Sequence, residues 1–159
     1  MSGGFMIRLN VWFINLGIIW TVIFAVMSFY WAMGGMLGVK SLGGSIYEIA
    51  LNPSPSFLAV VWLTGFIKLL GAAVLAMLLV HWNNPKITRT LYYTAKISGV
   101  FLFLYGAFNF ITISLHALQL LDFDLDPYAT FWRLVFWEPF WMVGGVFYFF
   151  SAKKIKGSS

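Results

Sequence analysis

The chain has no cysteine and very few charged residues. Without cysteine it can form no disulfide framework, no thiolate nucleophile and no cysteine-ligated metal site. Only 9% of its 159 residues are charged, whereas about a quarter of the residues are charged in a typical soluble domain. Hydrophobic residues make up 61% of the chain instead. The composition therefore excludes a soluble globular domain and indicates an integral membrane protein.

The excess of positive charge does not indicate a nucleic-acid-binding protein. The formal net charge is +5, but the ten lysines and arginines are scattered at the ends of apolar runs and form no single basic face. The sequence also contains no GxSxG, HExxH or phosphate-loop motif. We therefore expect no nucleic-acid partner and no cofactor, and the sequence carries no signature of an enzyme.

Four apolar runs are each long enough to cross a membrane. At about 1.5 Å per residue, a helix of roughly 20 residues spans the roughly 30 Å hydrocarbon core of a bilayer. We therefore predict an all-α integral membrane protein, an antiparallel bundle of four transmembrane helices that forms a single domain over residues 1–156. Residues 157–159 are interpreted as a possible remnant of cloning. The expected spans are residues 9–31, 57–80, 97–121 and 131–152.

Glycine, serine and proline mark the boundaries of the first two spans. Gly34 and Gly35 are expected to break the first helix. The connection over residues 39–56 is rich in Gly, Ser and Pro, and it is predicted to be a loop. Prolines with serine N-cap candidates are expected to start the second span, namely Pro53 and Pro55 with Ser54 and Ser56.

The positions of the cations predict the orientation. One side of the membrane would carry Arg8, Lys86, Arg89, Lys96, Lys153, Lys154 and Lys156. The other side would carry Lys40, Arg133 and the aspartates at positions 122, 124 and 126. Because cytoplasmic loops carry the excess of Lys and Arg, we predict a multi-pass cell-membrane protein with both termini in the cytoplasm.

Lys68 is the single charge within the second span, and it lies near the middle of that span. A cation at the bilayer midplane costs from roughly 2.5 kcal/mol upward unless it finds a partner or water. An intramembrane lysine is therefore a candidate functional residue.

Glu138 in the fourth span is the best candidate partner for Lys68. Counted from the outer ends of their spans, the two residues differ in depth by about four positions, or roughly 6 Å, which a lysine side chain can reach. The next residue, Pro139, cannot donate a backbone hydrogen bond, so the helix is expected to kink and to leave the carbonyl of Val135 free. A glutamate beside such a kink favours a polar cavity.

The third span carries a periodic polar stripe. Its members recur at intervals of four, three and four residues, which places them on one side of a helix: Tyr105, Asn109, Thr112 and His116. If this stripe faces inward, it forms with Lys68 and Glu138 a polar cleft in the outer half of the bundle. Aromatic residues would roof the cleft, namely Tyr30, Trp31 and Trp141.

Each candidate also has a structural interpretation. Lys68 and Glu138 could form a buried ion pair that only fixes which helices are neighbours. His116 lies near a helix end, where a histidine often serves as a hydrogen-bonded interface residue. Asn109 and Thr112 would then supply interhelical hydrogen bonds of about 0.6 kcal/mol each.

The chain also resembles a known family. The segment FYWAMGGMLG at residues 29–38, the proline-initiated second span and the aromatic and acidic residues before Pro139 carry this resemblance. On these features the chain is similar to the domain-of-unknown-function family 3995, small four-helix bacterial membrane proteins. The resemblance implies four spans and a bacterial cytoplasmic membrane, and it implies no activity and no site residue.

The leading functional hypothesis is a module that binds or transports a small amphipathic or anionic molecule. Aromatic walls with a few polar groups are the usual lining of a small-molecule pocket, and the predicted outward-facing cleft has both. A transporter of this size would need to form a homodimer to provide a pathway. The alternative is an accessory or structural membrane subunit without a ligand, whose polar stripes would serve helix packing or a membrane partner protein. The third hypothesis is an intramembrane enzyme that uses Glu138 or His116 as acid or base, although no nucleophile or metal set supports it.

Overall fold

All of the regular structure in residues 2–156, the part of the chain that the computed structural model describes, is helical. A 3-10 turn, η1 (Val39–Ser41), precedes the second helix, and a π-helix, η2 (Arg133–Trp137), joins the last two. The α-helices are α1 (Ser2–Ala32), α2 (Gly44–Leu51), α3 (Pro55–Met77), α4 (Pro85–Ala117), α5 (Pro127–Trp132) and α6 (Glu138–Lys156). Residues 157–159, the possible cloning remnant, lie outside the described residues.

Four helical stretches among the described residues are long and apolar enough to cross a membrane. They are Val11–Ala32, Pro55–Met77, Pro85–Ala117 and Pro127–Lys153. The last of these runs through α5, η2 and α6 without a break in the helical path. The predicted all-α membrane architecture with four spans is therefore confirmed.

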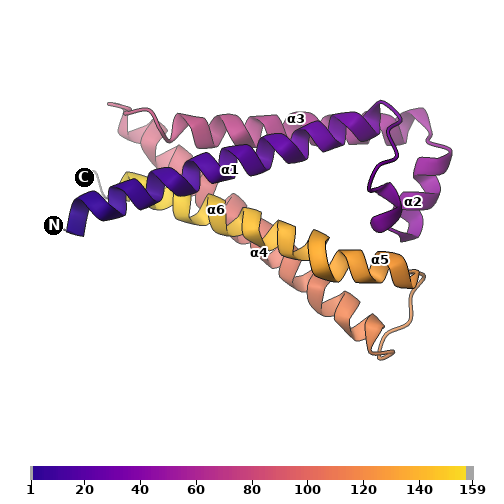
Figure 1. Cartoon of the computed structure of the whole chain (residues 1–159). Coiled ribbons are helices and arrows are strands. Elements are labelled where there is room, and N and C mark those ends of the chain that lie inside the picture. The colour runs from indigo at the N-terminus through magenta and orange to yellow at the C-terminus, as the bar shows by residue number, and fades with distance from the viewer. Residues whose placement is uncertain (1, 157–159) are drawn as a thin grey trace.

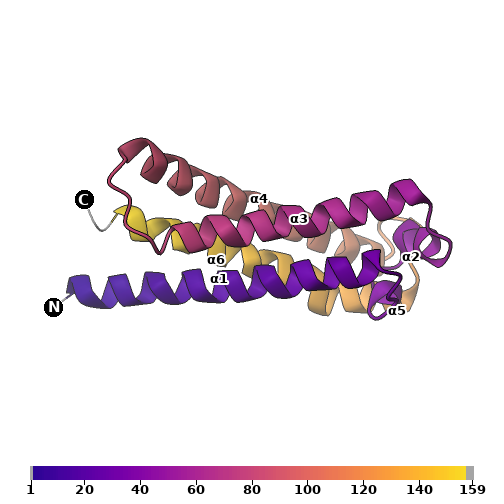
Figure 2. The ribbon, with the colours of Figure 1, turned by 90° about the horizontal axis from the view of Figure 1, so that it is seen from above.

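The four long helices form two antiparallel pairs that diverge toward one end, as Figures 1 and 2 show. α1 packs along α3, α4 packs along α6, and α1 also contacts α6, which joins the two pairs. Both chain ends lie where the pairs meet, whereas α2 and α5 lie where the pairs diverge. We call the end with α2 and α5 the open end of the bundle.

The core lies along α1 and α6, which are the helices that join the two pairs. Ile14, Trp20 and Phe24 of α1 are buried together with Leu75 of α3 and Tyr148 of α6. The indole Nε1 of Trp20 donates a hydrogen bond to the carbonyl of Phe140, with a distance of 3.1 Å between nitrogen and oxygen. The two pairs are therefore packed together along α1 and α6, away from the open end.

Three helices begin with the same pattern, a polar N-cap residue followed by proline. Proline suits the first position of a helix because its missing N–H would have no partner there. The capping side chains, Ser54, Asn84 and Asp126, accept hydrogen bonds from the backbone N–H groups of Phe57, Lys86 and Ala129. The predicted cap at Ser54 is confirmed. The third span was expected to begin at residue 97, but α4 begins at Pro85, directly after its cap Asn84. The basic residues that were expected in the connection between the second and third spans therefore lie on α4.

One part of the predicted loop at residues 39–56 is wrong, because residues 44–51 form α2. The glycines at positions 43 and 44 indicated a loop, but they only introduce the helix. Gly43 has a φ of +63°, and a Cβ built on it would clash with the Cβ of Ala129 in α5. Glycine at this position therefore lets the segment before α2 lie directly against α5.

The contact between α4 and α6 depends on glycine. A Cβ built on Gly145 would lie 2.5 Å from the backbone nitrogen of Phe103 and 2.7 Å from the carbonyl oxygen of Gly99. A Cβ on Gly99 would in turn lie 2.5 Å from the backbone nitrogen of Phe149. Small residues allow membrane helices to approach closely, and here the neighbouring atoms are backbone and cannot turn away.

We expect the substitution Gly145→Ala to force α4 and α6 apart. Overpacking of this kind typically lowers the free energy of unfolding by about 1–3 kcal/mol. Thermal unfolding of the purified protein in detergent measures the effect. Val100→Ala on the exposed side of α4 is the matched control, and a surface change of this kind should stay within about 0.5 kcal/mol of the original protein. A Gly145→Ala protein as stable as the control would contradict the close contact.

Candidate functional site

A cavity of about 270 Å³ lies between the two helix pairs at the open end. Its walls come from α1 and α3 on one side and from η2, α6 and Tyr105 of α4 on the other, and α2 contributes Ile46 and Ala50. The volume is just below the range of about 300–1,000 Å³ that is usual for small-molecule sites. Three charged residues are among those that line it, namely Lys68, Arg133 and Glu138.

Lys68 reaches across from α3 to α1. Its Nζ donates a hydrogen bond to Oγ of Ser28 at 2.7 Å and lies 4.1 Å from the ring centroid of Phe24. The Ser28 hydroxyl donates its own hydrogen to the carbonyl of Phe24, so its oxygen is free to accept from the lysine. An ammonium group has three N–H donors, and a neutral hydroxyl takes one of them. Among the described residues, Lys68 has no carboxylate partner.

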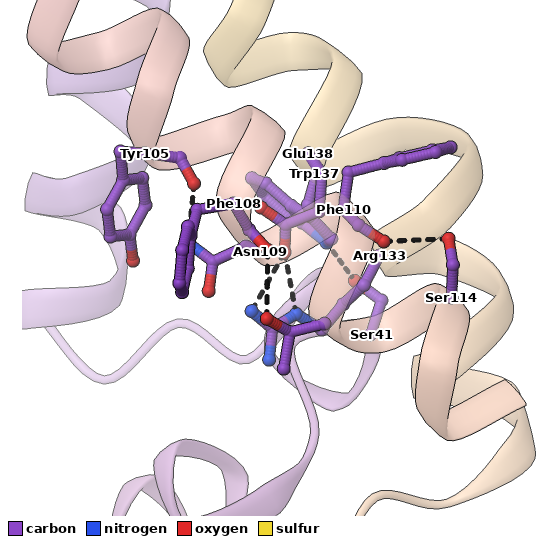
Figure 3. Close-up of polar contacts among 10 residues, drawn as sticks. Ser41, Tyr105, Phe108, Asn109, Phe110, Ser114, Arg133, Trp137 and Glu138 are labelled. Atoms are coloured by element: carbon purple, nitrogen blue, oxygen red, sulfur yellow. Dashed lines mark hydrogen bonds and ion pairs between the residues drawn. The ribbon is translucent and has the colours of Figure 1, made fainter. Parts of the chain in front are cut away.

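Glu138 pairs with Arg133 and not with Lys68, so the predicted ion pair is wrong. Oε1 of Glu138 accepts hydrogen bonds from Nε of Arg133 at 2.9 Å and from the terminal nitrogen Nη2 at 2.8 Å. Figure 3 shows these two contacts side by side. Arg133 lies on the same helical stretch, whereas Lys68 would have to reach across the cavity. The local arginine therefore takes the place that was expected for the lysine.

The π-helix explains how two residues five positions apart can pair. In an α-helix, side chains five residues apart point about 140° away from each other. Here the backbone N–H of Glu138 donates to the carbonyl of Arg133, a five-residue hydrogen bond that turns both side chains to nearly the same side. Pro139 has no N–H to offer Val135, which favours such an irregularity. The predicted disturbance next to Pro139 therefore takes the form of a π-helix.

One oxygen of Glu138 is left without a partner. The residue is 1% exposed, and its Oε2 accepts no hydrogen bond from any group in the described part of the chain. A buried polar atom without a partner costs about 1–3 kcal/mol, or more when it is charged, so such atoms are rare in native structures. Since Glu138 also lines the cavity, this oxygen is a candidate contact for a bound molecule.

Aromatic rings form much of the apolar wall. Trp141 lies 4.8 Å from Phe24 and 5.1 Å from Tyr105, measured between ring centroids. Trp31 and Trp137 lie 5.7 Å apart. The predicted residues Trp31, Tyr105 and Trp141 thus line the cavity together with Lys68 and Glu138. Tyr30, which was expected in the roof, packs over Gly35 instead.

The segment before α2 is bound to the π-helix. Nε1 of Trp137 donates to Oγ of Ser41 at 2.8 Å, and this hydroxyl donates to the carbonyl of Gly38. Figure 3 shows the bond between Trp137 and Ser41 close to the pair of Arg133 and Glu138. The segment before α2, which lines the cavity at the open end, is therefore hydrogen-bonded directly to the helical stretch that carries Glu138.

Three of the four predicted stripe residues, Asn109, Thr112 and His116, do not line the cavity. Asn109 donates from Nδ2 to the carbonyl of Tyr105 at 2.8 Å, and Thr112 donates to the carbonyl of Phe108 at 2.9 Å. Both bonds stay within α4, as Figure 3 shows for Asn109. The stripe was expected to face the bundle interior, but α4 packs mainly on α6 and diverges from α3. Only Tyr105 of this stripe reaches the cavity.

His116 holds the connection between α4 and α5. Its ring nitrogens Nδ1 and Nε2 each lie 3.2 Å from a backbone carbonyl, those of Leu121 and Leu125. Its ring stacks on Phe123 with 4.3 Å between centroids. These contacts agree with the structural interpretation of His116, and they lie away from the residues that line the cavity.

Sequence reasoning missed Arg133 and Ser28. Arg133 was expected on the outer side of the membrane because it lies at the outer end of the fourth span, although its spacing of five from Glu138 and the following proline could have indicated a π-helical pair. Ser28 lies within an otherwise apolar run and gave no signal by itself. A polar residue in a transmembrane helix is expected to find a partner, and Ser28 finds Lys68.

Comparison with known proteins identifies a matching family, but it finds no individual relative of known activity. Residues 21–148 match the model of a family described as "Protein of unknown function (DUF3995)", a range that covers most of the chain, including the four spans in whole or in part. No curated protein and no solved structure matches the chain significantly.

Proposed function

Because the chain belongs to the DUF3995 family of proteins of unknown function, its activity has to be inferred from its own structure, and we propose that it binds or transports a small amphipathic anion in the cavity at the open end. The observation that carries this proposal is the charge of the cavity. Two cations, Lys68 and Arg133, and one carboxylate, Glu138, line it, which leaves a net charge of +1 in their ionised forms. Arg133 and Glu138 already pair with each other, so Lys68 is the cation left for a ligand.

The walls of the cavity favour an apolar body attached to that anionic group. Trp31, Trp137 and Trp141 supply aromatic surface, and α2 and α3 add aliphatic side chains. Apolar walls with a few polar groups that orient the ligand are typical of small-molecule sites. An anion with a short apolar chain matches both features, whereas a small inorganic anion would leave the aromatic surface uncovered.

A pair of probes of matched size tests this proposal. Hexanoate and hexan-1-ol have the same chain length, and only hexanoate carries a negative charge. We expect hexanoate to raise the melting temperature of the purified protein in detergent and to do so more than the alcohol, because a ligand that binds the folded state stabilises it. Equal effects of the two probes, or no effect of either, would contradict an anion site.

The orientation and location of the protein are part of the same proposal. The distribution of Lys and Arg supports cytoplasmic termini, which would make the open end face outward. The family resemblance supports a bacterial cytoplasmic membrane, and we keep residues 1–156 as a single domain. The cavity would then take up its ligand from the outer side of the membrane.

An accessory subunit without a ligand is the second candidate. It is favoured by the polar residues of α4, since Asn109, Thr112 and His116 are bonded to the chain's own backbone. The charge in the cavity separates the two candidates. A purely structural subunit has no need of a half-buried lysine that lines a cavity without a carboxylate partner among the described residues.

A further inference from the structure

Two residues with unused hydrogen-bonding capacity line the same cavity from opposite helix pairs. Lys68 on α3 offers N–H donors beyond the one that Ser28 accepts, and Glu138 on α6 offers Oε2 as an acceptor. The two residues form no ion pair with each other. A molecule that satisfies both groups must therefore carry an acceptor for Lys68 and a donor for Glu138.

We propose that the ligand is an amphipathic acid that also carries a hydrogen-bond donor next to its carboxylate, as an α-amino or α-hydroxy acid with an apolar tail does. Its carboxylate would bind Nζ of Lys68, its ammonium or hydroxyl group would donate to Oε2 of Glu138, and its tail would lie on the tryptophans. This inference rests on the proposed function and narrows the class of ligand.

The burial of Glu138 is the observation that requires the donor. At 1% exposure the carboxylate cannot be satisfied by bulk solvent, and both donors of Arg133 that contact it bind the other oxygen, Oε1. Oε2 therefore needs a hydrogen-bond donor that the described part of the chain does not supply. A simple carboxylate such as hexanoate has no such donor, so it would occupy the Lys68 side and leave Oε2 unsatisfied.

Arg133 keeps Glu138 in place through one oxygen, and the second oxygen has no partner among the described residues. The two N–H groups of the guanidinium grip one carboxylate oxygen, and the π-helix fixes the spacing of the pair. Arg133 is thus a positioning residue in this arrangement, and Glu138 is the group that touches the ligand. The bond from Trp137 to Ser41 holds the same helix against the segment before α2.

Four acids of similar size test the inference on the unchanged protein in detergent. Hexanoate is the reference, 2-hydroxyhexanoate and 2-aminohexanoate carry the donor, and 2-methylhexanoate fills the same space without one. We expect at least one donor-bearing acid to bind about tenfold tighter than 2-methylhexanoate in calorimetric titration, because a hydrogen bond to a charged group is involved. The acid that binds more tightly identifies the donor as ammonium or hydroxyl.

The variant Glu138→Gln changes the hydrogen-bonding role of the position that Oε2 occupies. The glutamine oxygen can still accept from Arg133, but an NH₂ group replaces Oε2, so an acceptor becomes a donor. We expect the tenfold ratio between 2-methylhexanoate and the preferred acid to fall to about one in this variant. If the variant is too unstable to titrate, the comparison of the four acids on the unchanged protein still decides.

The outcomes separate this inference from the proposed function. If hexanoate binds and neither donor-bearing acid binds more tightly than 2-methylhexanoate, the donor subsite is wrong and the anion site remains. If no acid binds, both proposals fail. A preference for a donor-bearing acid that persists unchanged in Glu138→Gln would also overturn the role of Oε2.

Discussion

Replacing Arg133 by methionine is expected to lower the free energy of unfolding by about 3–5 kcal/mol, because the change leaves the carboxylate of Glu138 buried without its cation. The side chain of Glu138 is 2% exposed and that of Arg133 is 24% exposed, so the arginine is better solvated than the carboxylate. Removing the arginine alone should therefore cost far more than the pair contributes when both partners are present.

A double-mutant cycle measures the effect. Arg133→Met and Glu138→Gln are made singly and together, and thermal unfolding in detergent is followed. The double variant should recover most of the loss caused by Arg133→Met, since no unpaired charge remains. Arg89→Met is the matched control, because Arg89 is exposed and forms no ion pair among the described residues, so its removal should have a small effect.

A parallel double-mutant cycle with Lys68→Met and Glu138→Gln tests whether Glu138 pairs with Lys68 instead of Arg133. Lys68 and Glu138 form no ion pair, so the coupling energy of this cycle is expected to be near zero. A coupling of several kcal/mol between Lys68 and Glu138, with none between Arg133 and Glu138, would contradict the observed pairing.

Replacing Lys68 by methionine is expected to weaken the binding of hexanoate by about ten- to a hundredfold. The reason is the loss of a charge-assisted hydrogen bond, which contributes about 1.5–3 kcal/mol. Methionine keeps the length and the apolar character of the lysine stem, so the shape of the cavity changes little. The binding of hexan-1-ol should stay the same, since the alcohol does not need the positive charge.

Calorimetric titration of hexanoate into the original and Lys68→Met proteins checks this prediction. Lys40→Met is the matched control, because Lys40 is a cation at the same end of the bundle that contacts Tyr128 and does not line the cavity. A loss of affinity as large in the control as in Lys68→Met would show that general charge, and not the cavity, attracts the anion.

Much of the fold could be predicted from the sequence because hydrophobicity and length determine which segments span a bilayer. The four apolar runs, the cap at Ser54 and the disturbance beside Pro139 are all local signals, and each is present in the structure. α2 was missed because its two introducing glycines and its short length resemble a loop.

The candidate site was harder to predict because it depends on how the helix pairs diverge. A helical period places Tyr105, Asn109, Thr112 and His116 on one side of α4, but the period does not say which helix covers that side. Because α4 packs closely on α6 through glycine, the residues that follow Tyr105 on this side of α4 do not line the cavity. The partner of Glu138 was missed for a related reason, since depth was compared between helices and the nearest cation lay five residues away on the same one.

The position of a bound anion tests the central proposal most directly. In crystals grown with 6-bromohexanoate, the anomalous scattering of bromine locates the tail, and the electron density locates the carboxylate. We expect the carboxylate beside Nζ of Lys68 and the bromine against the aromatic wall that includes Trp141. Bromine found only on the lipid-facing surface, with the cavity filled by water, would contradict the proposed anion site.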